Sequence, residues 1–164
     1  MKQDISVSKF FTRNSVNELV VGTHSGIFHS DDVIGIALYC IKNSENKIHV
    51  VRSRDLKELG KCDLLIDIGA GKFDHHQIGG NGHRINGVPY ASAGLYWCHY
   101  GKEIIKELAK HRLDVNLTEA ETNSIFNFLD ENIIQEIDKC DNGIKALPTP
   151  LDYIVYFLPN WKFV

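Results

Sequence analysis

Histidine and aspartate side chains concentrate in two short stretches of the chain, a distribution typical of a metal site. Five of the eight histidines lie in two stretches, residues 24–29 and 75–83, close to four aspartates. The histidines are His24, His29, His75, His76 and His83, and the aspartates are Asp31, Asp32, Asp67 and Asp74. Imidazole and carboxylate ligands without a nearby thiolate suit Mn²⁺, Fe²⁺, Zn²⁺ or Mg²⁺ rather than a structural sulfur site. The pattern therefore predicts a divalent metal centre.

The first stretch follows an apolar run that is expected to form a strand. His24 comes directly after this run, His29 stands five residues further on, and Asp31 follows two residues later. A turn between a strand and a helix can aim these side chains at one point. Asp31 and Asp32 are both good N-caps for the next helix, and Asp32 also fits ligation or support of a metal.

The second stretch begins at the end of another apolar run. Asp67 follows Leu64-Leu65-Ile66, where an unpaired carboxylate would be costly to bury. A cation is the expected compensation. Asp74 and His75 come at a distance that lets the chain leave the strand, turn and return to the same pocket. The alternative is that each of these groups is a solvated cap or turn residue.

Strands and helices in alternation are expected to position these groups. Apolar runs of strand length span residues 17–22, 47–52 and 62–68, and residues 33–41 suit a buried helix. With a short helix before the last strand, this order is typical of a parallel α/β sheet. Nearly continuous apolar strands agree, because parallel strands are covered on both faces. Seven of the thirteen glycines fall between Gly69 and Gly94, in the loops beyond the strand ends where such sheets keep their chemistry.

The second half of the chain has the apolar periodicity of helices. Ser92 is expected to cap one helix, and Thr118 with Glu121 forms a capping box for another. The buried side of the first helix is expected to contain Leu95, Cys98, Ile104, Ile105 and Leu108. That of the second is expected to contain Ile125, Phe126, Leu129, Ile133 and Ile137, with Gly143 as its stop. Residues 153–158 are expected to form a short packed helix or strand.

Composition narrows the protein class. A chain of 164 residues, 43% hydrophobic and 24% charged, is typical of one soluble globular domain. The net charge of −3 gives no global attraction for nucleic acid or an anionic membrane, so a phosphate must be held by a local site. No apolar stretch approaches the ~18 residues of a membrane span, and the start lacks a secretory signal, so a cytoplasmic protein without a membrane partner is expected. The four cysteines form no CxxC pair and are expected to be buried thiols.

Five short motifs share one family pattern. They are His24-x-Gly26-x-Phe28-His29-x-Asp31-Asp32, Asp67-Ile68-Gly69, Phe73-Asp74-His75-His76-Gln77, Ser92-Ala93-Gly94-Leu95 and Ile137-x-x-x-Asp141-Asn142-Gly143-Ile144. Together they resemble the melanocyte-proliferating-gene family, within the DHH phosphoesterase superfamily. That family is associated with metal-dependent RNA exonuclease activity. The resemblance implies a DHH domain, a three-layer α/β sandwich with a mainly parallel, Rossmann-like sheet.

The same resemblance implies a binuclear site for two divalent ions, with manganese expected and magnesium, iron or zinc as alternatives. One ion would be held by His24, His29 and Asp67. The other would be held by Asp31, a bridging Asp67, His75 and a late acidic residue, for which Asp141 is preferred to Asp138. Two cations ~3.5–4 Å apart can bridge a hydroxide, lower its pKa and neutralise charge on the attacked phosphate.

Further residues are candidates for catalysis and substrate binding. His76 is expected to donate to a phosphate oxygen or leaving group, Asp74 to orient its neighbours, and Asp32 to support the metal. Substrate contacts are expected from Ser92, Gln77, His83 and Arg84. The alternatives are an ordinary N-cap at Ser92 and a solvated loop for the others.

Two features depart from the family pattern. Ile78 stands where the family usually carries a basic residue. The chain also ends just past a segment that resembles the end of the family's first domain. We therefore expect one catalytic domain over residues 1–164 without a second, substrate-gripping domain. A second copy or a separate chain would then complete the cleft.

The leading hypothesis is a Mn²⁺-dependent phosphodiesterase or exonuclease that hydrolyses short RNA, DNA or nucleotides through a metal-bridging hydroxide. A pyrophosphatase or a cyclic-dinucleotide phosphodiesterase would use the same metals. Outside the enzymes, the alternative is a metal-binding assembly module without catalytic activity.

Overall fold

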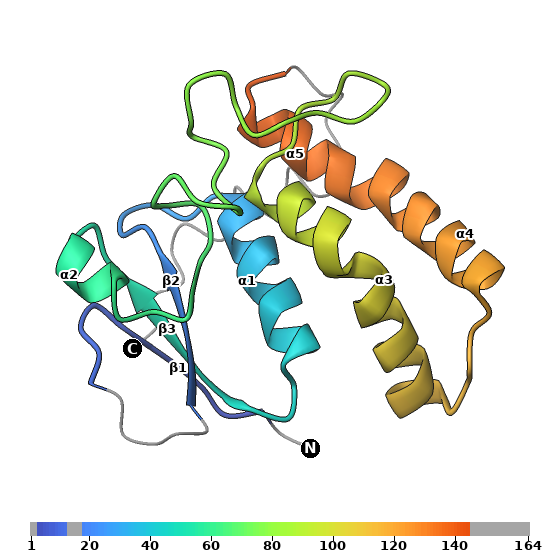
Figure 1. Cartoon of the computed structure of the whole chain (residues 1–164), viewed down its shortest axis with the longest axis horizontal. Coiled ribbons are helices and arrows are strands. Elements are labelled where there is room, and N and C mark those ends of the chain that lie inside the picture. The colour runs from blue at the N-terminus through green and yellow to red at the C-terminus, as the bar shows by residue number, and fades with distance from the viewer. Residues whose placement is uncertain (1–2, 13–17, 145–164) are drawn as a thin grey trace.

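The computed structural model describes residues 3–12 and 18–144, and its centre is a four-stranded parallel sheet (Figure 1). The strands are β1 (Ile5–Ser8), β2 (Glu18–Thr23), β3 (Lys47–Arg52) and β4 (Leu64–Leu65), in the order β1-β3-β2-β4. All pairs run parallel, so the carboxyl ends of the strands meet at one edge. The predicted α/β class and parallel sheet are confirmed. The element expected at residues 153–158 lies outside the described residues.

Both faces of the sheet are covered, because its central strands are apolar on both sides. Val21 and Val50, paired in register, join the main core beneath helix α1 (Ser30–Lys42). Val20 and Val51 point to the opposite face and pack with Phe11. On this second face helix α2 (Leu56–Leu59) approaches β2, and a Cβ at Gly22 would lie 3.2 Å from Leu59. The arrangement is consistent with a three-layer sandwich.

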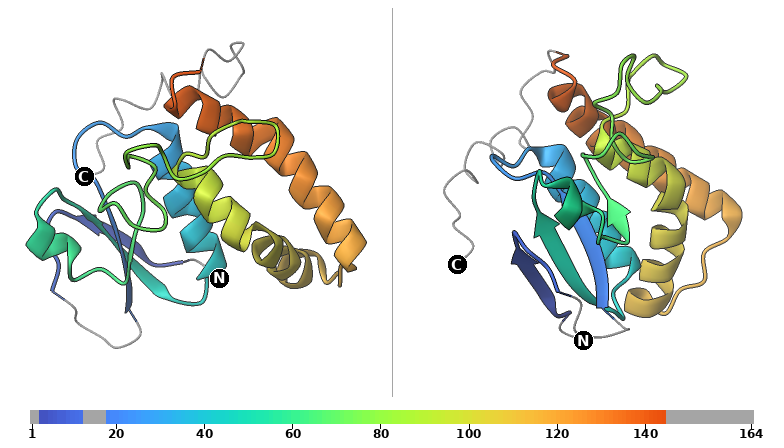
Figure 2. Two further views of the ribbon diagram at one scale, coloured as in Figure 1. Left: turned by 45° about the horizontal axis from the view of Figure 1, so that its top comes forward. Right: turned by 60° about the vertical axis from the view of Figure 1, so that its left-hand side comes forward.

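The second half of the chain forms a helical layer over α1. It contains α3 (Ser92–Leu113), α4 (Glu119–Leu129), the π-helix η1 (Asp130–Ile134) and α5 (Gln135–Asp141). Helix α3 packs along α1, while α4 and α5 lie on the outer side of α3 (Figures 1 and 2). The rings of Trp97 and Phe126 stack 5.2 Å apart between α3 and α4. The sheet, α1 and this helical layer thus meet where α1 and α3 begin and α5 ends.

Several helix boundaries differ from the predicted ones. The N-cap of α1 is His29 and that of α3 is Ala91, so the caps expected at Asp31 or Asp32 and at Ser92 were wrong. Asp31, Asp32 and Ser92 lie instead in the first turns of these helices, where they are fully buried. The Ser92 backbone N–H donates to Asp31, which joins the two helix starts. The capping box of Thr118 and Glu121 is confirmed. Strand β4 is shorter than expected, although Asp63 and Ile66 also bond to the backbone of β2.

The apolar faces are only partly as expected. In α3 the buried residues include Tyr96, Trp97, Ile104 and Ile105, whereas Cys98 is exposed and Leu108 is 39% exposed. In the helical segment of residues 119–141, Ile134 is buried, whereas Ile133 is only partly buried. The π-turn at residues 130–134 adds a residue to the helical repeat and changes the phase. Of the four cysteines, Cys40 is buried and Cys62 partly buried, but Cys98 and Cys140 are exposed, which corrects the expectation of four buried thiols.

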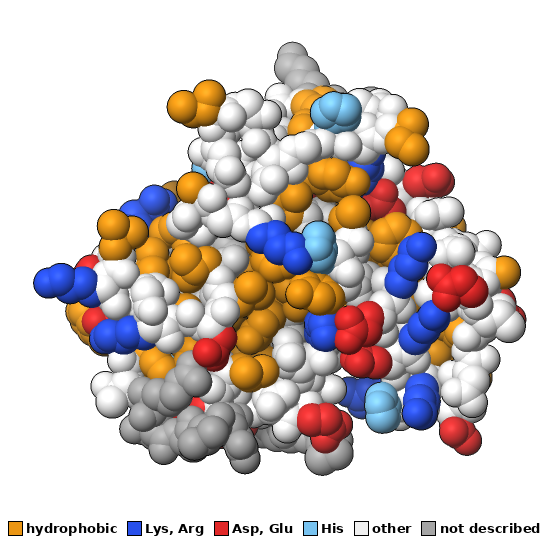
Figure 3. All heavy atoms as spheres, viewed as in Figure 1, with side chains coloured by type: hydrophobic (Ala, Val, Ile, Leu, Met, Phe, Trp, Pro, Cys, Tyr) orange, Lys and Arg blue, Asp and Glu red, His pale blue; other side chains and the backbone are white. Residues whose placement is uncertain are grey.

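The surface carries mixed charge. On the face in Figure 3, basic and acidic side chains lie beside one another over the helices. Ion pairs between helices include Lys42 with Glu103 at 2.7 Å and Lys106 with Glu119 at 2.6 Å. No helix in the described part of the chain has the length and apolar character required to cross a membrane.

Candidate metal centre

The site lies at the carboxyl edge of the sheet, where segments distant in sequence meet. His24 follows the end of β2, and Asp67 follows β4 by two residues. Helices α1 and α3 point their N-termini at this edge, and α5 brings its last residue, Asp141, to the same place. A parallel sheet places these strand ends together, as the sequence predicted.

A tight loop returns the chain from Asp67 to the Asp-His-His triplet. Asp67 has a φ of 61°, a left-handed conformation that Asp tolerates better than most residues. Its backbone N–H donates to the carbonyl of Phe73 at 2.9 Å, which closes the loop. Phe73 is 1% exposed and packs against Tyr96, with ring centroids 5.1 Å apart. The buried ring anchors the loop, so the next three residues face Asp67.

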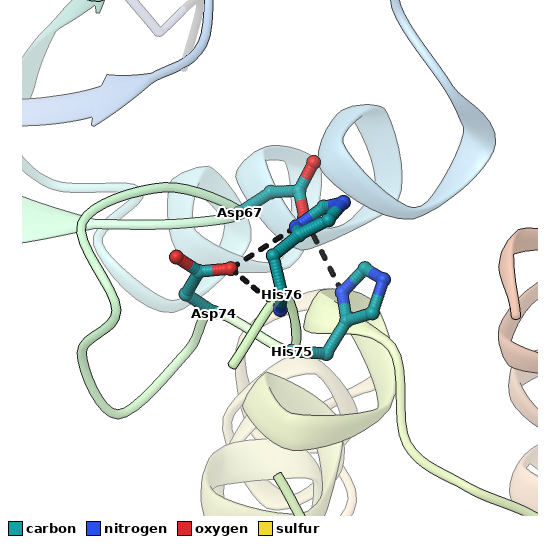
Figure 4. Close-up of side chains that lie close together, drawn as sticks. All are labelled: Asp67, Asp74, His75 and His76. Carbon is teal, nitrogen blue, oxygen red and sulfur yellow. Dashed lines mark hydrogen bonds and ion pairs between the residues drawn. The ribbon is translucent and has the colours of Figure 1, made fainter. Parts of the chain in front are cut away.

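Asp67 contacts both histidines of the triplet (Figure 4). Its Oδ1 lies 3.3 Å from Nδ1 of His75 and 3.1 Å from Nδ1 of His76. The Ser92 hydroxyl donates to the same oxygen at 2.9 Å. The other oxygen, Oδ2, faces Nε2 of His24 at 3.3 Å. Asp67 therefore lies between the β2 loop and the triplet, where a bridging ligand would be required.

His24 and Asp32 form the part of the site nearest β2. Nε2 of His24 lies 2.8 Å from Oδ2 of Asp32 and also faces Asp67. Nδ1 of His24 contacts the Ser25 carbonyl at 3.2 Å. A histidine whose Nδ1 is held by a carbonyl presents Nε2 to the centre, which is the usual arrangement of an imidazole ligand.

Asp141 joins the site from α5. One of its oxygens lies 2.8 Å from Nε2 of His75, and the other lies 3.3 Å from Nδ1 of His29. Asp31 faces the same group, with Oδ2 3.7 Å from Nδ1 of His75 and 3.3 Å from the Ser92 backbone nitrogen, which donates to it. Ligand atoms of His29, Asp31 and Asp141 lie within 4.8 Å of one another.

Three buried carboxylates in this group could bind a cation. Asp31, Asp32 and Asp67 are 0%, 0% and 3% exposed. Oδ1 of Asp31 and Oδ1 of Asp32 accept no hydrogen bond from residues 3–12 and 18–144, and Oδ2 of Asp67 has only the 3.3 Å ion-pair contact with His24. Buried carboxylate oxygens are normally paired or bound to a metal. Oxygen and imidazole donors also suit a divalent ion, so the residues fit the predicted centre.

The close packing of carboxylates and imidazoles shifts the pKa values of several groups in the site. A hydrogen bond with Asp32 raises the pKa of His24 to about 10. Burial opposes charge on His75, but its hydrogen bonds with Asp141 and Asp67 outweigh burial and raise its pKa to about 10. Burial, with repulsion from Asp141, raises the pKa of Asp31 to about 9. Protons on these groups therefore offset the charge of the carboxylates, and a bound metal ion would compete with them.

Similarity to known proteins identifies the family of the chain. A family model named MYG1_exonuc and described as an uncharacterised protein family (UPF0160) matches residues 20–155. The chain belongs to the MYG1 family. A MYG1 protein of Dictyostelium discoideum is 34% identical over 147 residues, covering 83% of this chain and 42% of that protein. A MYG1 exonuclease of Homo sapiens is 29% identical over 165 residues, covering 87% of this chain and 43% of that protein.

This MYG1-family chain spans less than half the length of those two relatives. A third, a MYG1 exonuclease of Mus musculus, is 30% identical over 76% of this chain and 35% of its own length. No solved structure gives a significant match.

The grouping of the expected ligands differs in detail from the one that the resemblance implied. The structure brings His24 to Asp32 and Asp67, and places His29 beside Asp31 and Asp141. The ring centroids of His24 and His29 are 5.8 Å apart. All six preferred ligands, His24, His29, Asp31, Asp67, His75 and Asp141, therefore reach the same centre, and Asp32 lies within it.

Asp74 and His76 form a further group with Asp67 and His75, whose ligand atoms all lie within 4.8 Å of one another. Oδ1 of Asp74 accepts from the His76 backbone N–H at 2.9 Å and lies 3.1 Å from Nδ1 of His76. Its Oδ2 accepts from the Ala70 N–H at 2.7 Å. The His76 side chain is 55% exposed, whereas that of Asp74 is 6% exposed. Asp74 thus orients His76 at the mouth of the site.

Two of the expected site residues lie away from the centre. Arg84 is 8% exposed; Nε and Nη2 donate to Asp130 at 2.8 and 2.6 Å, and Nη1 donates to Asp138 at 2.7 Å. The expectation of a phosphate clamp at Arg84 is therefore corrected, because this buried guanidinium is bound by the carboxylates of Asp130 and Asp138. Asp138, the reserve ligand, is bound to Arg84 and to the Gly94 N–H and does not face the ligands.

The other three substrate candidates have different surroundings. Ser92 is fully buried and holds Asp67 and Asp31, so it supports the ligands. The Gln77 amide donates to the carbonyls of Gly71 and Asp74 at 3.0 and 2.9 Å, which braces its own loop. His83 is exposed, and its Nδ1 contacts the carbonyl of Arg84. Substrate contact by Gln77 and His83 stays a prediction.

Sequence reasoning missed two arginines next to the site. Arg52 is the last residue of β3 and Arg54 follows it by two positions. Both donate hydrogen bonds to carbonyls of the loop that joins His24 to His29. Their position after a parallel strand was the available signal, since the ends of β2, β3 and β4 share one edge.

Proposed function

We propose that the protein is a metal-dependent phosphoesterase that hydrolyses phosphodiester bonds in short RNA, DNA or nucleotides, with a centre of the DHH superfamily type. The observation that carries the proposal is the convergence of three buried carboxylates, Asp31, Asp32 and Asp67, on the imidazoles of His24 and His75. The MYG1 relatives named as exonucleases support a nucleic-acid substrate.

Two divalent ions, with Mn²⁺ the preferred candidate, would be held by seven residues. These are His24, His29, Asp31, Asp32, Asp67, His75 and Asp141. When bound, such ions lower the pKa of an attacking water and neutralise charge on the phosphate. The fully buried Ser92 keeps Asp67 and Asp31 in place through its hydroxyl and its backbone N–H.

His76 is the group we assign to proton transfer. Its Nδ1 faces the carboxylates of Asp67 and Asp74, so Nε2 is the nitrogen available to a substrate. The half-exposed ring lies at the mouth of the site, within reach of the leaving oxygen of a phosphate held over the ligands. Donation of a proton at that oxygen is the role that suits this position.

The test is metal analysis of the purified protein followed by a substrate panel with added Mn²⁺. The panel contains a dinucleotide, a short single-stranded RNA, a short single-stranded DNA, a cyclic dinucleotide and inorganic pyrophosphate. Hydrolysis of the dinucleotide or single strands that disappears in Asp67→Asn is the expected result. Hydrolysis of pyrophosphate or the cyclic dinucleotide alone would favour those enzyme classes. Metal binding without turnover on any substrate would indicate an assembly module.

A further inference from the structure

We propose that Arg52 and Arg54 are positioning residues of the metal centre, which hold the loop 24–29 so that its histidines face the buried carboxylates. The assignment of those histidines as ligands rests on the proposed function. The clamp on the loop is a property of the metal-free chain and is testable by itself.

Arg52 holds the middle of the loop. It is paired in register with Thr23, the residue before His24, so its side chain starts at the base of the loop. Its Nη2 donates to the Gly26 carbonyl at 2.7 Å. The guanidinium also lies 3.5 Å from the centroid of the Phe28 ring, a cation–π contact. One side chain thus fixes two points between the histidines.

Arg54 holds the start of the loop. Its Nε donates to the Ser25 carbonyl at 3.2 Å. The same carbonyl is in contact with Nδ1 of His24 at 3.2 Å. A carbonyl held in this way sets the orientation of the imidazole, and Nε2 then faces Asp32 and Asp67. Outer contacts of this type tune the affinity of a ligand for its metal.

The loop depends on such contacts because it buries little of itself. Ile27 is 77% exposed, and the His29 side chain is 54% exposed. Gly26 has a φ of 115°, and a Cβ at this position would meet no atom within 4 Å, so the turn is open. The planar guanidinium of an arginine can donate to a carbonyl in its plane while its face stacks on a ring, whereas a lysine ammonium has no flat face to stack.

Arg52→Met and Arg54→Met test the clamp, because methionine keeps an unbranched stem and removes every donor. Arg112→Met is the matched control, because it removes the same charge from an exposed arginine in the last turn of α3. Hydrogen exchange at residues 25–29 is measured on the metal-free proteins by mass spectrometry. Mn²⁺ affinity is measured separately by titration, with circular dichroism to verify folding.

We expect faster exchange at residues 25–29 in Arg52→Met and Arg54→Met, and wild-type exchange in Arg112→Met. Mn²⁺ affinity should fall about 10-fold or more in the first two variants, as for other outer-shell substitutions. Wild-type exchange in both would overturn the clamp, and faster exchange with unchanged affinity would overturn its link to the metal. If Mn²⁺ affinity is unchanged and the KM for a dinucleotide exceeds that of the wild type at low salt but not at high salt, the arginines are substrate contacts instead. A wild-type protein that binds no metal would contradict the proposed function, while the exchange data would still decide the clamp.

Discussion

Arg84 and Asp138, 54 positions apart in the chain, form a buried ion pair with Nη1 of the arginine 2.7 Å from Oδ2 of the aspartate. The second oxygen of Asp138 accepts from the Gly94 backbone N–H at 3.0 Å. A Cβ at position 94 would lie only 1.8 Å from Oδ2, so glycine is required for this approach. The pair connects the loop before α3, the start of α3 and helix α5. It therefore holds Asp141, three residues after Asp138, beside His75 in the proposed metal centre.

Replacing Arg84 should destabilise the fold. Arg84→Met leaves the buried carboxylate of Asp138 and the partly buried one of Asp130 without their guanidinium, and breaking a buried pair in this way costs about 3–5 kcal/mol. Urea unfolding measures the change. His83→Ala is the control, because this neighbouring side chain is exposed and should change stability by less than about 0.5 kcal/mol. Unchanged stability of Arg84→Met with a higher KM would restore the phosphate-clamp role.

Removing metal should lower the melting temperature. The carboxylates of Asp31, Asp32 and Asp67 are buried close together, and an ion that binds only the folded chain stabilises it by about 2.7 kcal/mol at 100 times its Kd. Thermal scans with Mn²⁺ and with a chelator measure this. Asp67→Asn should respond much less than the wild type. The same melting temperature under both conditions would argue against the site.

The two histidines of the triplet should fail in different ways. His75 is 8% exposed and contacts Asp31, Asp67 and Asp141, so His75→Ala should lose metal and activity together. His76 is half exposed at the mouth, so His76→Ala should retain metal but lose turnover by about 10²–10⁴-fold, the usual contribution of a general acid. Metal content and single-turnover rates of both variants provide the check. Equal metal loss in both would show that the division of roles is wrong.

Alkaline pH should destabilise the metal-free protein. The pKa values of His24 and His75, about 10, exceed the ~6.5 of an unfolded histidine, so their stabilisation is complete below pH ~6.5 and is lost as the pH rises toward 10. The pKa of Asp31, about 9, exceeds the unfolded ~3.9, and its contribution also declines with rising pH.

Mn²⁺ competes with these same protons, so the stabilisation that it provides should increase with pH. Urea unfolding at stepped pH values, with a chelator and with Mn²⁺, gives both curves. A metal-free stability that is constant or increases between pH ~6.5 and ~9 would contradict this coupling of protons to the site.

Much of the site was determined by local sequence. Apolar runs placed the strands, and a parallel sheet brings the residues after them to one edge, so the sequence alone assigned His24 and Asp67 to one centre. The loop that returns from Asp67 to Asp74 is only a few residues long, and its closure by Phe73 follows from that length. Thr118 and Glu121 marked a helix start by contacts three residues apart. In the last two cases the interacting groups are close along the chain, and in the first the parallel sheet itself brings the two strand ends together.

Tertiary packing decided the rest. The π-turn at residues 130–134 shifts the helical phase, which turns Asp138 toward Arg84 and leaves Asp141 facing His75. Periodicity over a uniform helix contains no signal for that shift, so either acid was an acceptable ligand from sequence. The sequence did not show that the loop residue Arg84 is buried and paired, because its partners lie about fifty positions away. Such pairings depend on how α3 and α5 pack, and burial of a charge is stable only where that packing supplies its counter-charge.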